Sequence, residues 1–181
     1  MNSRKKLSFK VAIGGVIAAL SLLLMLVAGV TTSLVYAIPM ITGAFLMALV
    51  IEFGARFATL EYVAISIASM LLLGNKEAAI MYVAFFGYYP IIKSFIEKNL
   101  KKSIGWITKY LIFNVSMVVA YFVVSNIFMI TFDDLEGFGR YAMPVLLLIG
   151  NILFVLYDIM LTRLVTLYIY KWQKYVKRMF K

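Results

Sequence analysis

The segment from Val11 to Ile51 contains no Asp, Glu, Lys, Arg or His. The hydrocarbon core of a bilayer is about 30 Å thick, and a helix needs about 20 apolar residues to cross it. The uncharged segment of 41 residues is about twice that length, which predicts a helical hairpin in a membrane. Hydroxyl residues and a proline interrupt the apolar pattern midway, so we expect the turn between Thr31 and Pro39.

The composition extends this prediction to the whole chain. Hydrophobic residues make up 64% of the sequence and charged residues 14%, whereas about a quarter of the residues in soluble domains are charged. We therefore expect one all-α domain over residues 1–181, a polytopic membrane protein with six transmembrane helices. The expected helices are residues 9–30, 38–53, 57–73, 78–96, 106–130 and 141–170, followed by a basic tail at residues 171–181.

The positive charge is unevenly distributed. The formal net charge is +10, and most of it lies in three clusters that six helices place on one membrane face. By the positive-inside rule this face, with both termini, is cytoplasmic, and we expect the plasma membrane of a prokaryote. Membrane lipid is the expected partner of the basic tail, with a cytoplasmic protein as the alternative, and no nucleic acid is expected. The clusters are Arg4, Lys5, Lys6 and Lys10; Lys93, Lys98, Lys101, Lys102 and Lys109; and Lys171, Lys174, Lys177, Arg178 and Lys181.

Catalytic and metal-binding motifs are missing from the sequence. It contains no Cys and no His, which removes thiolate chemistry and the commonest metal ligand and general base. It also has no Walker-type glycine loop. We therefore expect a protein that is not an enzyme and holds no cofactor or metal, so that any uphill transport is powered by another subunit.

Polar residues within the predicted helices form the first group of candidate site residues. A charge at the centre of a transmembrane helix costs about 2.5–3.5 kcal/mol on insertion scales, and Asp158 lies deepest. It is either a relay site or half of a structural pair with Lys109, Arg163 or Asn114, and we favour the structural pair. The predicted intramembrane polar network is Glu61, Lys109, Asn114, Asp158 and Arg163.

A second group lies at the outer ends of the predicted helices. Small-ligand pockets combine apolar and aromatic walls with a few convergent polar groups, and these residues offer that mixture. Asn126 and Asn151 are the most informative, because buried amides need hydrogen-bonding partners. The alternative is a set of solvated loop residues. The predicted substrate-binding residues are Tyr36, Asn75, Lys76, Glu77, Tyr82, Asn126, Arg140, Tyr141 and Asn151.

The first helix carries two overlapping pairs of small residues. Gly14 pairs with Ala18 and Gly15 with Ala19, and a spacing of four puts each pair on one helix face, where another backbone can approach closely. The pairs either dock a partner helix or pack inside the protein.

The chain resembles the substrate-binding S-component of energy-coupling factor (ECF) transporters. The resemblance lies in its length, its six predicted helices, its cytoplasmic termini and the basic start before the segment from Lys10 to Leu20. This resemblance implies capture of a vitamin or other small micronutrient from outside, between the outer halves of the later helices. It also implies a transmembrane coupling protein and two ATPase subunits. In that family an Ala-xxx-Ala face of the first helix docks the coupling protein; the matching positions here are Gly15 and Ala19, or Gly14 and Ala18. No vitamin-specific signature is present, so the substrate is open.

Two other classes are consistent with parts of the pattern. A non-transporting scaffold, similar to the rod-shape-determining membrane subunit of cell-wall synthesis, would share the size and helix number but would have no ligand pocket. An intramembrane enzyme would need catalytic residues that the sequence does not offer.

Overall fold

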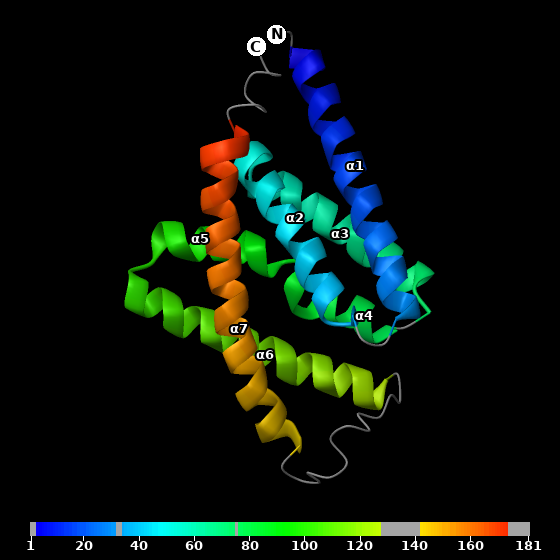
Figure 1. Ribbon diagram of the computed structural model, residues 1–181, viewed down its shortest axis with the longest axis vertical. Helices are drawn as coiled ribbons and strands as arrows, with labels where there is room; N and C mark the ends of the chain where they lie inside the picture. The colour runs from blue at the N-terminus through cyan, green and yellow to red at the C-terminus, as the bar shows by residue number, and fades with distance from the viewer. Residues whose placement is uncertain (1–2, 32–33, 75, 128–141, 174–181) are drawn as a thin grey trace.

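The computed structural model describes residues 3–31, 34–74, 76–127 and 142–173, and all regular secondary structure in these ranges is helical (Figure 1). The helix bounds lie close to the predicted ones, apart from an earlier start of the first helix and a break in the fourth. The elements are α1 (Ser3–Val30), α2 (Ala37–Phe53), α3 (Ala55–Leu72), α4 (Lys76–Met81), the π-helical turn η2 (Tyr82–Phe86), α5 (Tyr89–Asn99), α6 (Lys102–Asn126), α7 (Ala142–Leu167) and the π-helical turn η4 (Tyr168–Trp172).

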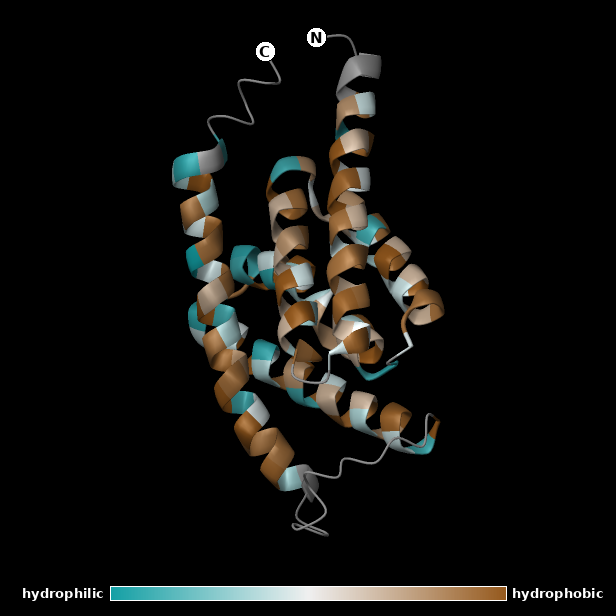
Figure 2. Cartoon of the chain, turned by 45° about the vertical axis from the view of Figure 1, so that its right-hand side comes forward, coloured by the Kyte–Doolittle hydropathy of each residue, from teal (hydrophilic) through white to brown (hydrophobic). Residues whose placement is uncertain are grey.

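Five helical segments in the described ranges are long and apolar enough to cross a membrane. They are Leu7–Val30, Ala55–Leu72, Lys76–Asn99, Lys102–Asn126 and Pro144–Lys171. The helix α2 is apolar too, but shorter, with 17 residues. Large apolar side chains are exposed on the outer faces, among them Leu71 and Leu148. Figure 2 shows hydrophobic residues along most of α1 and along much of α7. The all-α fold and the apolar helices predicted from the sequence are confirmed, and they are compatible with a membrane protein.

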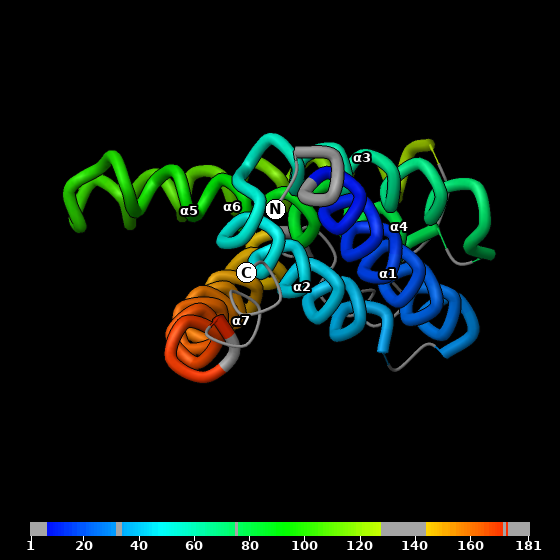
Figure 3. The backbone as a smooth tube through the Cα atoms, turned by 90° about the horizontal axis from the view of Figure 1, so that it is seen from above, coloured from blue at the N-terminus to red at the C-terminus, as the bar shows by residue number. Residues whose placement is uncertain are grey.

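The first three helices pack side by side, as Figures 1 and 3 show. Their shared core includes Met25, Leu46 and Ile65, which are fully buried. Between α2 and α3 the chain turns at Gly54, whose φ of +85° is a backbone conformation that residues with a Cβ rarely adopt. The positive φ of Gly54 therefore explains why α2 ends near the predicted boundary at residue 53.

The predicted helix at residues 78–96 is interrupted by η2. The backbone N–H of Gly87 donates to the carbonyl of Tyr82 across this wider turn, at 2.8 Å. The irregularity precedes Pro90, which lies in the first turn of α5, where a missing N–H costs little. The interruption brings Phe85 into a second core, in which its ring centroid lies 5.1 Å from that of Phe113.

The hairpin of α5 and α6 lies across α7 rather than parallel to it, which is visible in both Figure 1 and Figure 3. The predicted arrangement of helices running up and down in sequence does not include such a crossing. The crossing follows from the interruption at η2 and from aromatic packing between the hairpin and α7. In this packing, Phe113 of α6 stacks on Phe154 of α7 with ring centroids 4.8 Å apart. The crossing also brings the polar residues of α5, α6 and α7 together.

Candidate polar cavity between α5, α6 and α7

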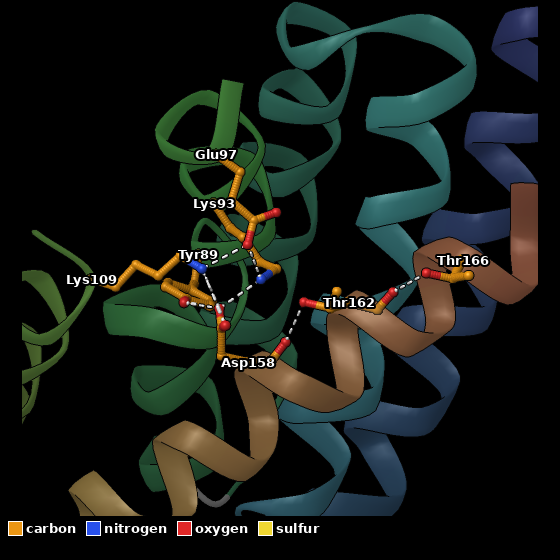
Figure 4. A network of polar contacts seen from close by, with 7 residues as sticks. All are labelled: Tyr89, Lys93, Glu97, Lys109, Asp158, Thr162 and Thr166. Carbon is orange, nitrogen blue, oxygen red and sulfur yellow. Dashed lines mark hydrogen bonds and ion pairs between the residues drawn. The ribbon is translucent and has the colours of Figure 1, made fainter. Parts of the chain in front are cut away.

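A buried carboxylate on α7 binds one lysine from each helix of the hairpin (Figure 4). Asp158 Oδ1 lies 2.7 Å from Lys93 Nζ and 3.0 Å from Lys109 Nζ. The three side chains are 4%, 0% and 5% exposed, respectively. Because both lysines are withdrawn from solvent, removing their shared counter-ion would leave uncompensated buried charge.

Glu97 extends this cluster to the molecular surface. Its Oε1 lies 2.6 Å from Lys109 Nζ and also accepts a hydrogen bond from Lys93, while the Glu97 side chain is 44% exposed. Each lysine thus contacts both carboxylates. Two ammonium groups and two carboxylates make the cluster formally neutral, which is the condition under which buried charges are tolerated.

The local helical structure explains how the groups reach one another. Tyr89, Lys93 and Glu97 are spaced by four along α5, so they lie on one helix face. The Tyr89 hydroxyl donates to Asp158 Oδ1 at 2.5 Å. On α7, Thr162 Oγ1 donates to the Asp158 carbonyl at 2.9 Å, and Thr166 repeats this bond one turn later. Figure 4 shows both threonines following Asp158 along the same helix.

The cluster opens into a cavity of about 480 Å³. Its walls mix charged groups, threonine hydroxyls and apolar or aromatic side chains, as small-ligand pockets do. The lining residues are Ile96, Glu97, Leu100, Lys102, Gly105, Trp106, Lys109, Asp158, Ile159, Thr162, Arg163 and Thr166.

A second hollow, of about 440 Å³, lies between α2 and α7 and is lined mainly by apolar residues such as Phe45 and Leu164. Its Tyr168 hydroxyl donates to Glu52 at 3.2 Å. The hollow offers little polar chemistry, so the charged cavity is the stronger candidate site. In the described ranges no group of three acidic side chains is arranged to hold a metal ion.

The predicted intramembrane network is distributed over three places. The expected contact between Asp158 and Lys109 is present, and Arg163 lines the adjoining cavity. Asn114 instead forms a reciprocal amide pair with Asn151, with N–O distances of 3.0 and 2.9 Å. Glu61 lies against α1, where a Cβ added at Gly14 would stand 2.1 Å from its Oε1.

The described members of the predicted outer pocket do not form one site. Asn151 is engaged by Asn114 rather than by Asn126, which is exposed and donates to the Phe122 carbonyl of its own helix. Lys76 Nζ donates to the carbonyls of Met70 and Leu73, both at 2.7 Å. It therefore caps the end of α3 instead of facing a ligand.

Two tyrosines of the predicted outer pocket, Tyr36 and Tyr82, differ in the hydrogen bonding of their hydroxyl groups. The Tyr36 hydroxyl donates to Glu77, which joins the start of α2 to α4. Tyr82 is fully buried, and its hydroxyl has no hydrogen-bond partner among the described residues. The other three predicted residues, Asn75, Arg140 and Tyr141, lie outside the residues that the structure describes.

The two small-residue pairs of α1 face different surroundings. Gly14 packs against Phe57 and Glu61 of α3, and Ala18 is half-buried beside the α1–α3 core. Gly15 has open space where a Cβ would stand, and Ala19 is exposed. Internal packing therefore accounts for the first pair, while the second faces outward.

Two members of the charged cluster, Lys93 and Glu97, were not among the predicted site residues. Lys93 was counted with the lysines of one membrane face, and Glu97 lies just beyond the helix predicted at residues 78–96. The signal that points to them is the spacing of Tyr89, Lys93 and Glu97, which places an ion pair and a hydroxyl on one helix face. The partner of Lys93 on α7, Asp158, lies 65 residues further along the chain, and this contact becomes visible only with the crossing of α5 and α7.

Comparison of the chain with protein-family models, with curated proteins and with solved structures gives no match.

Proposed function

We propose that the protein is the substrate-binding membrane subunit of an importer of the ECF type, which captures a vitamin or other small micronutrient for uptake powered by partner subunits. The observation that supports this most is the cavity of about 480 Å³ beside the charged cluster. Its volume lies within the range of small-ligand sites, about 300–1,000 Å³. A scaffold protein needs no such cavity, so this feature favours small-molecule binding over the scaffold alternative.

The proposed topology follows the charge distribution. With α2 counted as a sixth crossing, both termini lie in the cytoplasm of a prokaryotic cell, by the positive-inside rule. Lys98 at the end of α5, Lys101 in the connection and Lys102 at the start of α6 assign this end of the hairpin to the same side. Because Lys102 also lines the cavity, the cavity belongs to the cytoplasmic half in this proposal. It is then the position from which the solute leaves inward, and not the outer pocket that the family resemblance implies.

The outward pair Gly15 and Ala19 is the proposed docking face for a coupling protein. Small side chains allow a partner helix to approach α1 closely, and among the described residues no other helix comes within 4 Å of a Cβ placed at Gly15. Gly14 and Ala18 are engaged inside the protein and have no part in this docking.

Purification from native membranes in a mild detergent tests the proposal. We expect a coupling protein and two ATPase subunits to accompany the wild-type chain, and a Gly15→Leu variant to lose them while keeping its thermal unfolding midpoint. Val16→Leu, at a neighbouring exposed position, is the matched control and should retain the complex. Purification of a wild-type chain without ATPase subunits would contradict the importer assignment. A Gly15→Leu chain that keeps them would contradict the docking face.

A further inference from the structure

The cavity contains more positive than negative charge. Lys93 and Lys109 are neutralised by Glu97 and Asp158 through four ion pairs. The wall contributes two further cations, Lys102 and Arg163. The site as a whole therefore has a formal excess of two positive charges over its two carboxylates.

The two further cations are Lys102 and Arg163. Both line the cavity, and neither forms an ion pair with another residue in the part of the chain that the structure describes. They come from different helices, Lys102 from the first turn of α6 and Arg163 from the second half of α7. A ligand in the cavity thus meets positive charge contributed by two helices, while both lining carboxylates are already paired with lysines.

The side chains also indicate which anion fits. A guanidinium group presents its N–H donors in a planar fork that matches the oxygen atoms of a phosphate. An ammonium group supplies a compact second charge, as lysine does at many phosphate sites. Two unpaired cations match the charge of a phosphate group, which lies between −1 for a diester and about −2 for a monoester.

Resting on the proposed function, we infer that the ligand of this cavity is a phosphate-bearing molecule whose phosphate is bound by Arg163 and Lys102. The cavity volume leaves room for the remainder of a small phosphate ester. The apolar residues Leu100 and Ile159, which are 37% and 46% exposed at the cavity, equally suit the glycerol and acyl attachment of a phospholipid. A soluble phosphate ester and an anionic lipid headgroup share this chemistry, and the experiment separates them.

The soluble arm uses the purified full-length protein in an uncharged detergent, titrated with inorganic phosphate at constant ionic strength against chloride. A ligand that binds the folded state raises the unfolding midpoint. We expect Arg163→Gln and Lys102→Gln each to weaken phosphate binding about tenfold, because each removes a charge-assisted contact. Lys98→Gln removes a positive charge from the same turn but not from the cavity wall, and it should change the affinity less than twofold.

The lipid arm uses native mass spectrometry of the same variants from nanodiscs containing equal parts of phosphatidylglycerol and phosphatidylcholine. Selective retention of phosphatidylglycerol that Arg163→Gln abolishes, without stabilisation by free phosphate, identifies a headgroup as the source. Stabilisation by phosphate without selective lipid retention identifies a soluble ester. Either result supports the inference.

The inference is overturned if neither probe binds, or if Arg163→Gln binds as well as the wild type. Its failure is distinguishable from failure of the importer assignment, because these arms require no partner subunit. A chain that binds phosphate but never purifies with ATPase subunits would keep the ligand class and lose the uptake function. The reverse result would keep the uptake function and remove phosphate as the ligand.

Discussion

Lys93 and Asp158 lie 65 residues apart in the chain, yet their charged groups meet at 2.7 Å with both side chains buried. The contact joins α5 to α7 at the point where the hairpin crosses, and Lys109 of α6 binds the same carboxylate. Three helices therefore converge on Asp158. The crossing is stabilised there by charge neutralisation and, one turn deeper, by the aromatic packing of Phe85, Phe113 and Phe154.

Replacing Asp158 tests the charge balance of the cluster. Asp158→Leu leaves two buried lysines with one carboxylate, and we expect a loss of about 3–5 kcal/mol in the free energy of unfolding. Adding Lys93→Met restores the balance, with Lys109 still paired to Glu97, so the double variant should be more stable than Asp158→Leu alone by about 1 kcal/mol or more. Unfolding of all variants in the same detergent measures this. Simple additivity of the two single effects would contradict a coupled cluster.

The amide pair between α6 and α7 gives a second prediction. Asn151→Ala removes both bonds to Asn114, and we expect a loss of about 0.6–2 kcal/mol, the range found for hydrogen bonds between transmembrane helices. Asn126→Ala is the matched control, because Asn126 is exposed and, among the described residues, bonds only to its own helix; it should change stability by less than about 0.5 kcal/mol. Equal effects of the two substitutions on the unfolding midpoint would show that the pair does not hold the helices together.

Gly43 gives a prediction about close helix packing. A Cβ at this position would stand 2.1 Å from the Phe86 carbonyl oxygen, which is a backbone atom of η2 and cannot move away alone. Gly43→Ala should therefore destabilise the fold by about 1–3 kcal/mol, as overpacking does. Gly15→Ala meets open space and should be neutral or slightly stabilising, because alanine favours the helix. The unfolding midpoints of the two variants, compared with that of the wild type, measure both effects. An unchanged midpoint for Gly43→Ala would mean that α2 does not approach η2 so closely.

Much of the fold follows from local properties that a sequence displays. Apolar runs of crossing length predict α1, α3, α6 and α7, and Gly54 marks the turn between the second and third helices. A partner for Asp158 was expected among Lys109, Arg163 and Asn114, because a charge deep in an apolar helix needs a partner; Lys109 is the one of these three that contacts it. These inferences use spacing, hydropathy and the cost of burying charge, none of which depends on how distant segments meet.

The remaining features depend on the crossing of the helices, which spacing does not encode. Nothing local indicates the irregular turn at Tyr82–Phe86, yet it directs α5 across α7 and moves Lys93 from a predicted basic face into the core. The same crossing lets Asn114 meet Asn151, which withdraws Asn151 from the predicted outer pocket. Lys76 was expected at a ligand, but the free carbonyls at the end of α3 are nearer partners.

Filling the cavity tests the central claim, that this cavity binds a small molecule, most directly. Gly105 lines the cavity, and a Cβ there would make an ordinary contact with Ile96 Cγ2 at 3.4 Å, so Gly105→Ala is a mild control while Gly105→Leu adds bulk to the wall. Native mass spectrometry of the three proteins, each purified from native membranes, should find a retained small molecule with the wild type and Gly105→Ala. It should be lost from a folded Gly105→Leu. Equal retention by all three proteins, or no bound molecule on the wild type, would contradict the account.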